Sequence, residues 1–157
     1  MSGSECLFCR IVEGEVPSHV VWQDDAHIAV LTPFPNTTGF TVVLTREHLP
    51  SYVCDLSDDA YAGLWNAGRA VARLIDRGLG TKRCGLVAEG FGIDHAHVKV
   101  IPMHGIPDGA WHPILSGRPN FLDKYEGFIT SADGPRMDDV ALSHIAMRIR
   151  GAGKSVP

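Results

Sequence analysis

The sequence predicts an α+β fold, in which an antiparallel sheet packs against helices on one face. Two observations support this prediction. Five short runs between residues 20 and 102 have the β-branched and apolar character of strands. One long amphipathic segment separates the third run from the fourth, and a second helical pattern lies near the C-terminus.

The elements before residue 45 are short and are bounded by residues that break regular structure. Gly14 and Pro17 end the first helical turn, the polar residues 23–25 join two strands as a hairpin, and residues 32–39 form a loop around Pro33 and Pro35. The expected elements are a helical turn over residues 7–12 and strands over residues 20–22, 27–31 and 40–44.

The long helix is predicted to begin after Ser57, a candidate N-cap that is followed by two acidic residues. It is expected to end at Gly78 or Gly80. Its apolar residues recur at three- and four-residue spacing and define one face: Tyr61, Leu64, Gly68, Val71 and Ile75.

After the long helix, the sequence predicts two further strands and a terminal helix, separated by a segment without a clear secondary-structure pattern. A fourth strand is expected over residues 84–88, and residues 94–102 contain the fifth. Residues 105–136 are rich in Gly and Pro and show no clear periodicity, whereas residues 138–150 predict a terminal helix with acidic residues first and arginines last.

Length and composition exclude several classes of protein. The 157 residues suit one domain, and 45% hydrophobic residues supply a packed core and exclude a disordered chain. The net charge of -4, without runs of like charge, argues against a nucleic-acid or polybasic membrane partner. No apolar run approaches the roughly 20 residues that cross a bilayer, and no signal peptide is visible, so we expect a cytoplasmic protein.

The four cysteines divide into a pair and two isolated residues. Cys54 and Cys84 are expected to be small buried hydrophobic residues without a role. Cys6 and Cys9 form C-L-F-C, whose spacing suits either a zinc site or a redox pair. The redox alternative is weaker, because that motif normally follows a strand, whereas this one precedes every predicted strand.

The segment Asp94-His-Ala-His-Val-Lys-Val-Ile-Pro102 is the most informative for function. Side chains alternate along a strand, so His95, His97 and Lys99 share one face, while the residues between them face an apolar core. Two kinds of chemistry fit this face. The two histidines can chelate a catalytic metal, or one imidazole can attack phosphorus while its neighbours hold the phosphate.

The order and separation of three motifs resemble those of the histidine triad (HIT) family. The motifs are C-L-F-C-R-I-V-E-G-E-V-P, T-T-G-F-T-V-V-L-T-R-E-H and H-A-H-V-K-V-I-P. The resemblance covers about residues 5–105 of a single domain spanning residues 1–157, and it leaves residues 106–157 as a C-terminal extension with a helix. In the family, the middle histidine of the triad attacks the α-phosphorus of a nucleoside phosphoramidate or a dinucleoside polyphosphate. The resemblance therefore implies that His97 is the nucleophile and forms a nucleotidyl-histidine, which water hydrolyses.

The resemblance also implies a structural zinc ion. Similar bacterial members bind zinc through two N-terminal cysteines, a histidine after the third strand and the first histidine of the triad. The matching residues here are Cys6, Cys9, His48 and His95. A zinc ligand at His95 would not be available as an acid or a base.

Several positions depart from the family pattern. Lys99 replaces the third histidine, and it keeps the positive charge but is a poor proton donor at neutral pH. Thr32 stands where the family has an Asp that binds ribose, and Ala88 stands near the position of an Asn that contacts phosphate. His104 is a candidate replacement for the missing proton donor. One apolar set resembles an intact base pocket, although its amphipathic spacing would equally suit a role in the core: Leu7, Phe8, Ile11 and Val16.

These observations predict a HIT-type hydrolase of phosphoanhydride or phosphoramidate bonds in nucleotides. His97 is expected to act as nucleophile and Lys99 to stabilise charge, and the family's habit of pairing chains through sheet edges suggests a homodimer. One alternative is a catalytically weakened nucleotide- or phosphate-binding protein of the same fold. Another is a zinc metallohydrolase that uses His95 and His97.

Overall fold

The computed structural model describes residues 5–106 and 136–153. It confirms the predicted α+β class, with five strands in the order β1-β2-β3-β5-β4 and every neighbouring pair antiparallel. The strands are β1 (Val20–Gln23), β2 (His27–Leu31), β3 (Thr41–Thr45), β4 (Cys84–Val87) and β5 (His97–Pro102). The helices are α1 (Leu7–Val12), α2 (Asp58–Leu79) and α3 (Asp139–Gly151), with a short 3₁₀ turn, η2 (Val53–Asp55).

The predicted alternation of faces holds along β5. Ala96, Val98 and Val100 are completely buried in the main core, which α2 covers. His97 and Lys99 lie on the opposite face, where they line a cavity. One face of β5 therefore packs into the core, and its other face presents polar side chains to the cavity.

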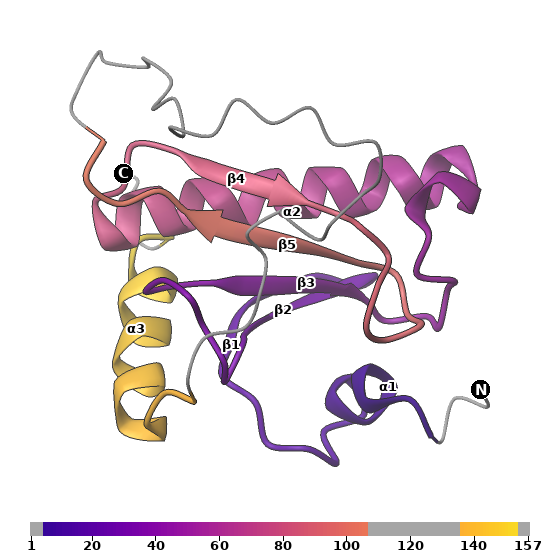
Figure 1. Ribbon diagram of the computed structural model, residues 1–157, viewed down its shortest axis with the longest axis horizontal. Helices are drawn as coiled ribbons and strands as arrows, with labels where there is room; N and C mark the ends of the chain where they lie inside the picture. The colour runs from indigo at the N-terminus through magenta and orange to yellow at the C-terminus, as the bar shows by residue number, and fades with distance from the viewer. Residues whose placement is uncertain (1–4, 107–135, 154–157) are drawn as a thin grey trace, which may run out of the picture.

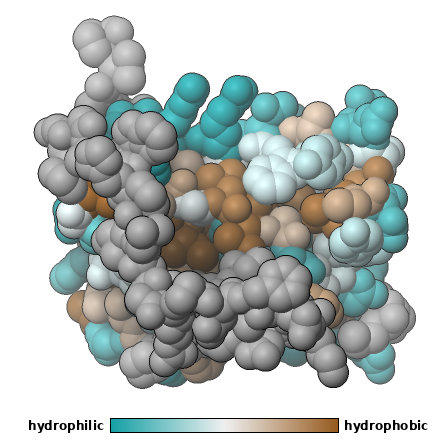
Figure 2. Space-filling view, turned by 45° about the horizontal axis from the view of Figure 1, so that its top comes forward, coloured by the Kyte–Doolittle hydropathy of each residue, from teal (hydrophilic) through white to brown (hydrophobic). Residues whose placement is uncertain are grey.

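Helices cover both faces of the sheet, which corrects the expectation that they pack on one face only. Helices α2 and α3 pack against the main core. On the second face, Phe8 and Ile11 of α1 pack against a separate cluster that includes Val30 and Val42. Figure 1 shows α2 running along the sheet, with α1 and α3 near its opposite ends. Figure 2 shows apolar residues gathered at the centre of one side of the molecule.

The ends of α2 follow the predicted signals. The Ser57 hydroxyl accepts a hydrogen bond from the Ala60 amide at 3.3 Å, and the helix ends at Gly80, whose φ of 70° favours glycine. Gly68 lets the helix approach the sheet closely, because a Cβ at this position would lie 3.1 Å from the side chains of Leu86 and Val98. The prediction for Tyr61 was wrong: this side chain is 42% exposed and contacts Trp65, since the first turn of the helix lies beyond the core.

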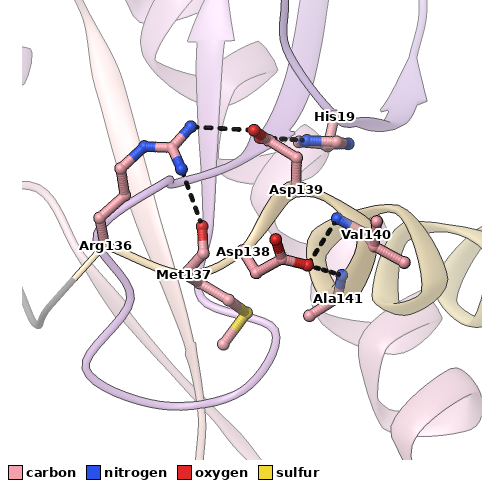
Figure 3. A network of polar contacts seen from close by, with 7 residues as sticks. All are labelled: His19, Arg136, Met137, Asp138, Asp139, Val140 and Ala141. Atoms are coloured by element: carbon pink, nitrogen blue, oxygen red, sulfur yellow. Dashed lines mark hydrogen bonds and ion pairs between the residues drawn. The ribbon is translucent and has the colours of Figure 1, made fainter.

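Helix α3 is fixed to the rest of the fold at its first turn. Asp138 is its N-cap and accepts hydrogen bonds from the amides of Val140 and Ala141 at 3.0 and 3.2 Å (Figure 3). Just before the helix, the Met137 amide donates to the Pro33 carbonyl at 2.9 Å. This contact attaches the start of α3 to the loop after β2.

The two isolated cysteines do not both behave as expected. Cys84 is half-buried at the start of β4, but Cys54 is exposed, because Val53 is the residue of the η2 turn that packs into the core. No helix in the described ranges has both the length and the hydropathy that a membrane crossing requires.

Candidate functional site

A cavity of about 920 Å³ opens on the sheet face that carries α1. Its wall is mostly apolar and includes side chains from α1, β2, β3 and the loop before β5. Polar groups enter it from β5 and from the start of α3. The residues predicted for nucleotide binding all line this cavity, together with the two predicted catalytic residues: Leu7, Phe8, Ile11, Val16, Thr32, His97 and Lys99. Their roles in binding and catalysis stay predictions.

The hydrogen bonds of His97 fix its orientation and its tautomer. Its Nδ1 lies 2.7 Å from the His95 carbonyl oxygen, which can only accept, so Nδ1 carries the proton. In the neutral ring, Nε2 then has a free lone pair. Burial lowers the pKa of His97, and the nearby Lys99 cation lowers it further, against the opposing effect of the hydrogen bond. This environment favours a neutral imidazole, the form that can act as a nucleophile.

Lys99 is held by an acidic residue that the sequence analysis did not identify. Its ammonium group pairs with the Glu89 carboxylate, and the two side chains are only 17% and 11% exposed. Val87 pairs with Lys99 across the sheet, and Glu89 lies two residues further on, so both have the same orientation as Lys99. Ala88, between them, packs against the main core and not into the cavity. The antiparallel register of residues 84–88 with β5 was the signal that could have revealed Glu89.

A second polar cluster consists of His19, Arg136 and Asp139, whose contacts are drawn in Figure 3. The Asp139 carboxylate accepts hydrogen bonds from Arg136 at 3.0 Å and from His19 at 3.3 Å. The hydrogen bond from Arg136 is the main reason that the pKa of Asp139 lies below its usual value. All three side chains line the cavity. No sequence motif marked them, because His19 and the start of α3 are brought together only by the tertiary fold.

The structure shows the surroundings of Thr32 and of His104, the candidate replacement for the missing proton donor. The Thr32 hydroxyl accepts a hydrogen bond from the Phe34 amide at 3.2 Å within its own loop. His104 donates from Nε2 to the Thr38 carbonyl at 2.8 Å and is not among the described residues that line the cavity. The structure thus gives no support to His104 as the missing proton donor. Trp111 and His112 belong to the C-terminal region, which the resemblance to the HIT family implies helps to close the site, and both lie outside the described residues.

The four residues predicted to bind zinc form a second site beside the cavity. One ligand atom from each of Cys6, Cys9, His48 and His95 lies within 4.8 Å of all the others. Burial is the main cause that raises the pKa of the Cys9 thiol, and the adjacent Cys6 adds to this effect. A bound cation would offset this effect by stabilising the thiolate.

The individual distances in this cluster suit a tetrahedral metal ion. The imidazole Nδ1 of His95 is 3.5 Å from the Cys6 sulfur and 3.6 Å from the Cys9 sulfur, and Nδ1 of His48 is 3.2 Å from the Cys9 sulfur. Typical zinc bond lengths at tetrahedral angles place N and S ligands about 3.5 Å apart. His95 donates from Nε2 to the Thr45 carbonyl at 2.7 Å, which leaves Nδ1 free to bind a metal.

His97 does not belong to this cluster. Among the described residues, only the four predicted ligands form the group that could hold a metal. Phe8 lies between the two sites and contacts both rings edge-on, with centroids 5.8 Å from His95 and 5.3 Å from His97. The geometry therefore does not favour a metallohydrolase that uses His95 and His97 on one ion.

Comparison with known proteins identifies the family. The HIT domain matches residues 13–106, which is more than half of the chain. The chain belongs to the HIT family. Protein hit of Bacillus subtilis is 30% identical over 109 residues, covering 66% of this chain and 74% of that protein. The adenosine 5'-monophosphoramidase hnt1 of Schizosaccharomyces pombe is 28% identical over 99 residues, covering 62% of this chain and 73% of that protein.

Solved structures of HIT proteins share the fold. A zinc-bound histidine triad family protein from Mycobacterium smegmatis superimposes with a TM-score of 0.67. The two chains are 21% identical, and the match covers 96% of this chain and 94% of the other. This similarity shows that the chain has the HIT fold.

Proposed function

We propose that this HIT protein hydrolyses phosphoramidate or phosphoanhydride bonds in nucleotides through a covalent nucleotidyl-histidine on His97. One observation carries the proposal: the hydrogen bond from Nδ1 of His97 to the His95 carbonyl, which leaves a basic Nε2 on a residue that lines the cavity. The similarity to an adenosine 5'-monophosphoramidase supports the same reaction class.

The reaction proceeds in two displacements. The Nε2 lone pair attacks the α-phosphorus, a P–N(His) bond forms, and the bond to the amine or phosphate leaving group breaks with its electron pair. The leaving group takes up a proton from solvent water, and the water that attacks in the second step returns one to solvent. Water then attacks the same phosphorus, restores the imidazole and releases the nucleoside monophosphate. Positioning and electrostatic stabilisation supply most of the acceleration, with Lys99 close to the charge that develops on the phosphoryl oxygens.

The apolar part of the cavity is proposed to hold the base. Leu7, Phe8, Ile11 and Val16 form a wall next to His97, and Thr32 lies on the opposite loop. A flat apolar surface of this kind binds a purine or pyrimidine by stacking and by excluding water. Without the Asp that the family uses for ribose, the protein is expected to bind the sugar less tightly.

We also propose that the Cys6, Cys9, His48 and His95 cluster binds a structural zinc ion. The donor set and the N–S distances fit zinc, and a zinc-bound histidine triad protein has the same fold. When bound, zinc would link segments of the fold and would not take part in the reaction: it would connect α1 and the loop after β3 to the segment that leads into β5. The cluster thereby holds the His95 backbone carbonyl that orients His97.

A homodimer and a cytoplasmic location also remain proposals. Strand β4 is at one edge of the sheet, so its outer backbone groups are available for pairing with a second copy. Light scattering coupled to size-exclusion chromatography tests the dimer, and a monomer at all concentrations would contradict it.

The reaction is tested with adenosine 5'-phosphoramidate and diadenosine polyphosphates, with release of AMP followed by chromatography. We expect turnover by the wild-type protein and a phosphorus-linked adduct on His97 that can be trapped by acid-free quenching and detected by mass spectrometry. His104→Ala is the matched control, because His104 is an exposed histidine outside the described cavity wall. Nucleotide binding without adduct or turnover would instead support the non-catalytic alternative.

A further inference from the structure

The cations of the cavity are each paired with a carboxylate. Among the described residues that line it, Lys99 and Arg136 carry positive charge, and their partners are Glu89 and Asp139. The lysine pair lies next to His97, where phosphorus would bind, and the arginine pair lies on the rim. The two pairs together carry no net charge, which is unusual for a site expected to bind a highly charged polyphosphate.

The two pairs differ greatly in burial. This difference decides which pair has the stronger electrostatic effect on a phosphoryl group beside His97. Arg136 and Asp139 are 55% and 65% exposed, so water and salt screen their charges. Lys99 and Glu89 are 17% and 11% exposed, so their charges are screened much less. Glu89 is therefore the acidic residue that sets the electrostatic potential felt by a phosphoryl group beside His97.

A buried ion pair is a weak means of stabilising a fold, because removing both charges from water offsets most of their attraction. The pair does, however, hold the Lys99 ammonium in place beside the nucleophile. It also limits how much negative charge the site accepts. A ligand that draws Lys99 away from Glu89 separates two opposite charges where water screens them weakly, which is unfavourable.

We propose that Glu89 is a positioning residue that restricts the reactive end of the cavity to phosphorus groups with a single negative charge. This inference rests on the proposed function and assigns its substrate class: nucleoside phosphoramidates or similar singly charged phosphodiesters, rather than dinucleoside polyphosphates. A phosphoryl group with one charge shares Lys99 with Glu89. Each further phosphate adds a charge that the Glu89 carboxylate repels.

The test is a binding series on one nucleoside. Adenosine 5'-methylphosphate, AMP and ADP carry roughly one, two and three negative charges at pH 8. Isothermal titration of the whole wild-type chain at constant ionic strength should give affinities that fall from the methyl ester to ADP. In Glu89→Gln, which keeps the size and an acceptor oxygen, ADP affinity should rise about tenfold relative to that of the methyl ester.

Two matched variants separate this effect from a general change in charge. Glu47→Gln removes an exposed carboxylate outside the cavity and should leave the series unchanged. Asp139→Asn breaks the exposed rim pair, and it should change the series less than Glu89→Gln and only at low salt. An equal effect from all three variants would overturn the assignment to Glu89.

Turnover gives a second readout that a purely structural role would not produce. Wild-type kcat/KM should favour the phosphoramidate over diadenosine polyphosphate, and Glu89→Gln should shift that ratio towards the polyphosphate mainly through KM. A wild-type protein that prefers ADP to the methyl ester overturns the inference, even if hydrolysis occurs on His97. The expected binding series without any turnover supports the inference and rejects the proposed hydrolysis. No binding of any of these ligands rejects both.

Discussion

His95 and His97 are two residues apart on one segment, yet their hydrogen bonds leave different ring nitrogens available. His95 donates from Nε2 to the Thr45 carbonyl, so its Nδ1 faces the two cysteines. His97 donates from Nδ1 to the His95 carbonyl, so its Nε2 is the free nitrogen on the cavity side. A backbone carbonyl therefore decides, in each case, which ring nitrogen remains available.

The two histidines therefore face two different regions: His95 faces the cysteine cluster, and His97 faces the cavity. The cluster of Cys6, Cys9, His48 and His95 brings distant segments together and could hold a metal ion, whereas the cavity side of His97 keeps one ring nitrogen free of hydrogen bonds to the protein. The two regions nevertheless share Phe8, and the His95 backbone takes part in both. Four predictions test how far the two regions are independent.

The largest expected effect is on the cavity side. His97→Ala should reduce turnover of the preferred nucleotide at least about 1000-fold, because no other described group replaces the nucleophile. Its metal content should stay close to wild type, since His97 is not a member of the cluster, but its thermal midpoint should fall because a buried ring is removed. Retained turnover in this variant would show that the nucleophile lies elsewhere.

The next effect is on the metal side. Cys9→Ser should lose the metal and reduce the free energy of unfolding by about 3 kcal/mol or more, because metal binding is coupled to folding. Metal analysis and thermal unfolding measure both quantities, with Cys54→Ser as the control at an exposed cysteine. Activity should fall with the folded fraction. Loss of all activity in a fully folded, metal-free protein would favour a catalytic metal instead.

A smaller effect is expected at the residue that contacts both regions. Phe8→Ala should reduce the free energy of unfolding by about 2 kcal/mol, less than for a fully buried Phe, and reduce turnover about tenfold. Leu7→Ala, at a neighbouring cavity residue that is 43% exposed, should change stability much less. If Phe8→Ala affects activity but not metal affinity, the two regions are less coupled than their shared contacts indicate.

The smallest effect concerns thiol reactivity and requires no substitution. Burial, followed by the nearby Asp76, raises the pKa of Cys84 to about 12, so its reactive thiolate is scarce at pH 8.5 and appears only as the pH approaches that value. With metal bound, iodoacetamide at pH 8.5 should therefore modify Cys54 alone. After chelation, Cys6 and Cys9 should also react, but more slowly than Cys54, because both are buried and burial raises the pKa of Cys9. Peptide mass spectrometry reads each site, and early modification of Cys84 would contradict the assignment.

Much of the fold could be predicted because its signals are local. The bounds of β2, the first residue of β4 and the N-cap of α2 agree with the sequence, since strand propensity, turn residues and capping act over a few positions. Tyr61 was placed wrongly on the buried face because helical periodicity does not reveal how far a sheet extends beneath a helix.

The candidate site was predicted less completely. The sequence identified His97 and Lys99, because strand alternation places them on one face. It did not identify Glu89, whose importance depends on pairing between two strands, or Arg136 and Asp139, which reach the cavity from a distant helix. The resemblance pointed to Ala88, near the position of a phosphate-contacting Asn, but this residue packs against the core.

By itself, the sequence determined the strands and helices, the two faces of β5 and the types of residue available for chemistry. These properties follow from the local geometry of the chain and from the order of its side chains. Only the tertiary structure decided which nitrogen of each histidine is free, which carboxylate accompanies Lys99, and that Cys9 meets His95 across 86 residues of sequence. Tautomers, ion pairs and metal clusters depend on partners from distant segments, and folding alone brings those partners together.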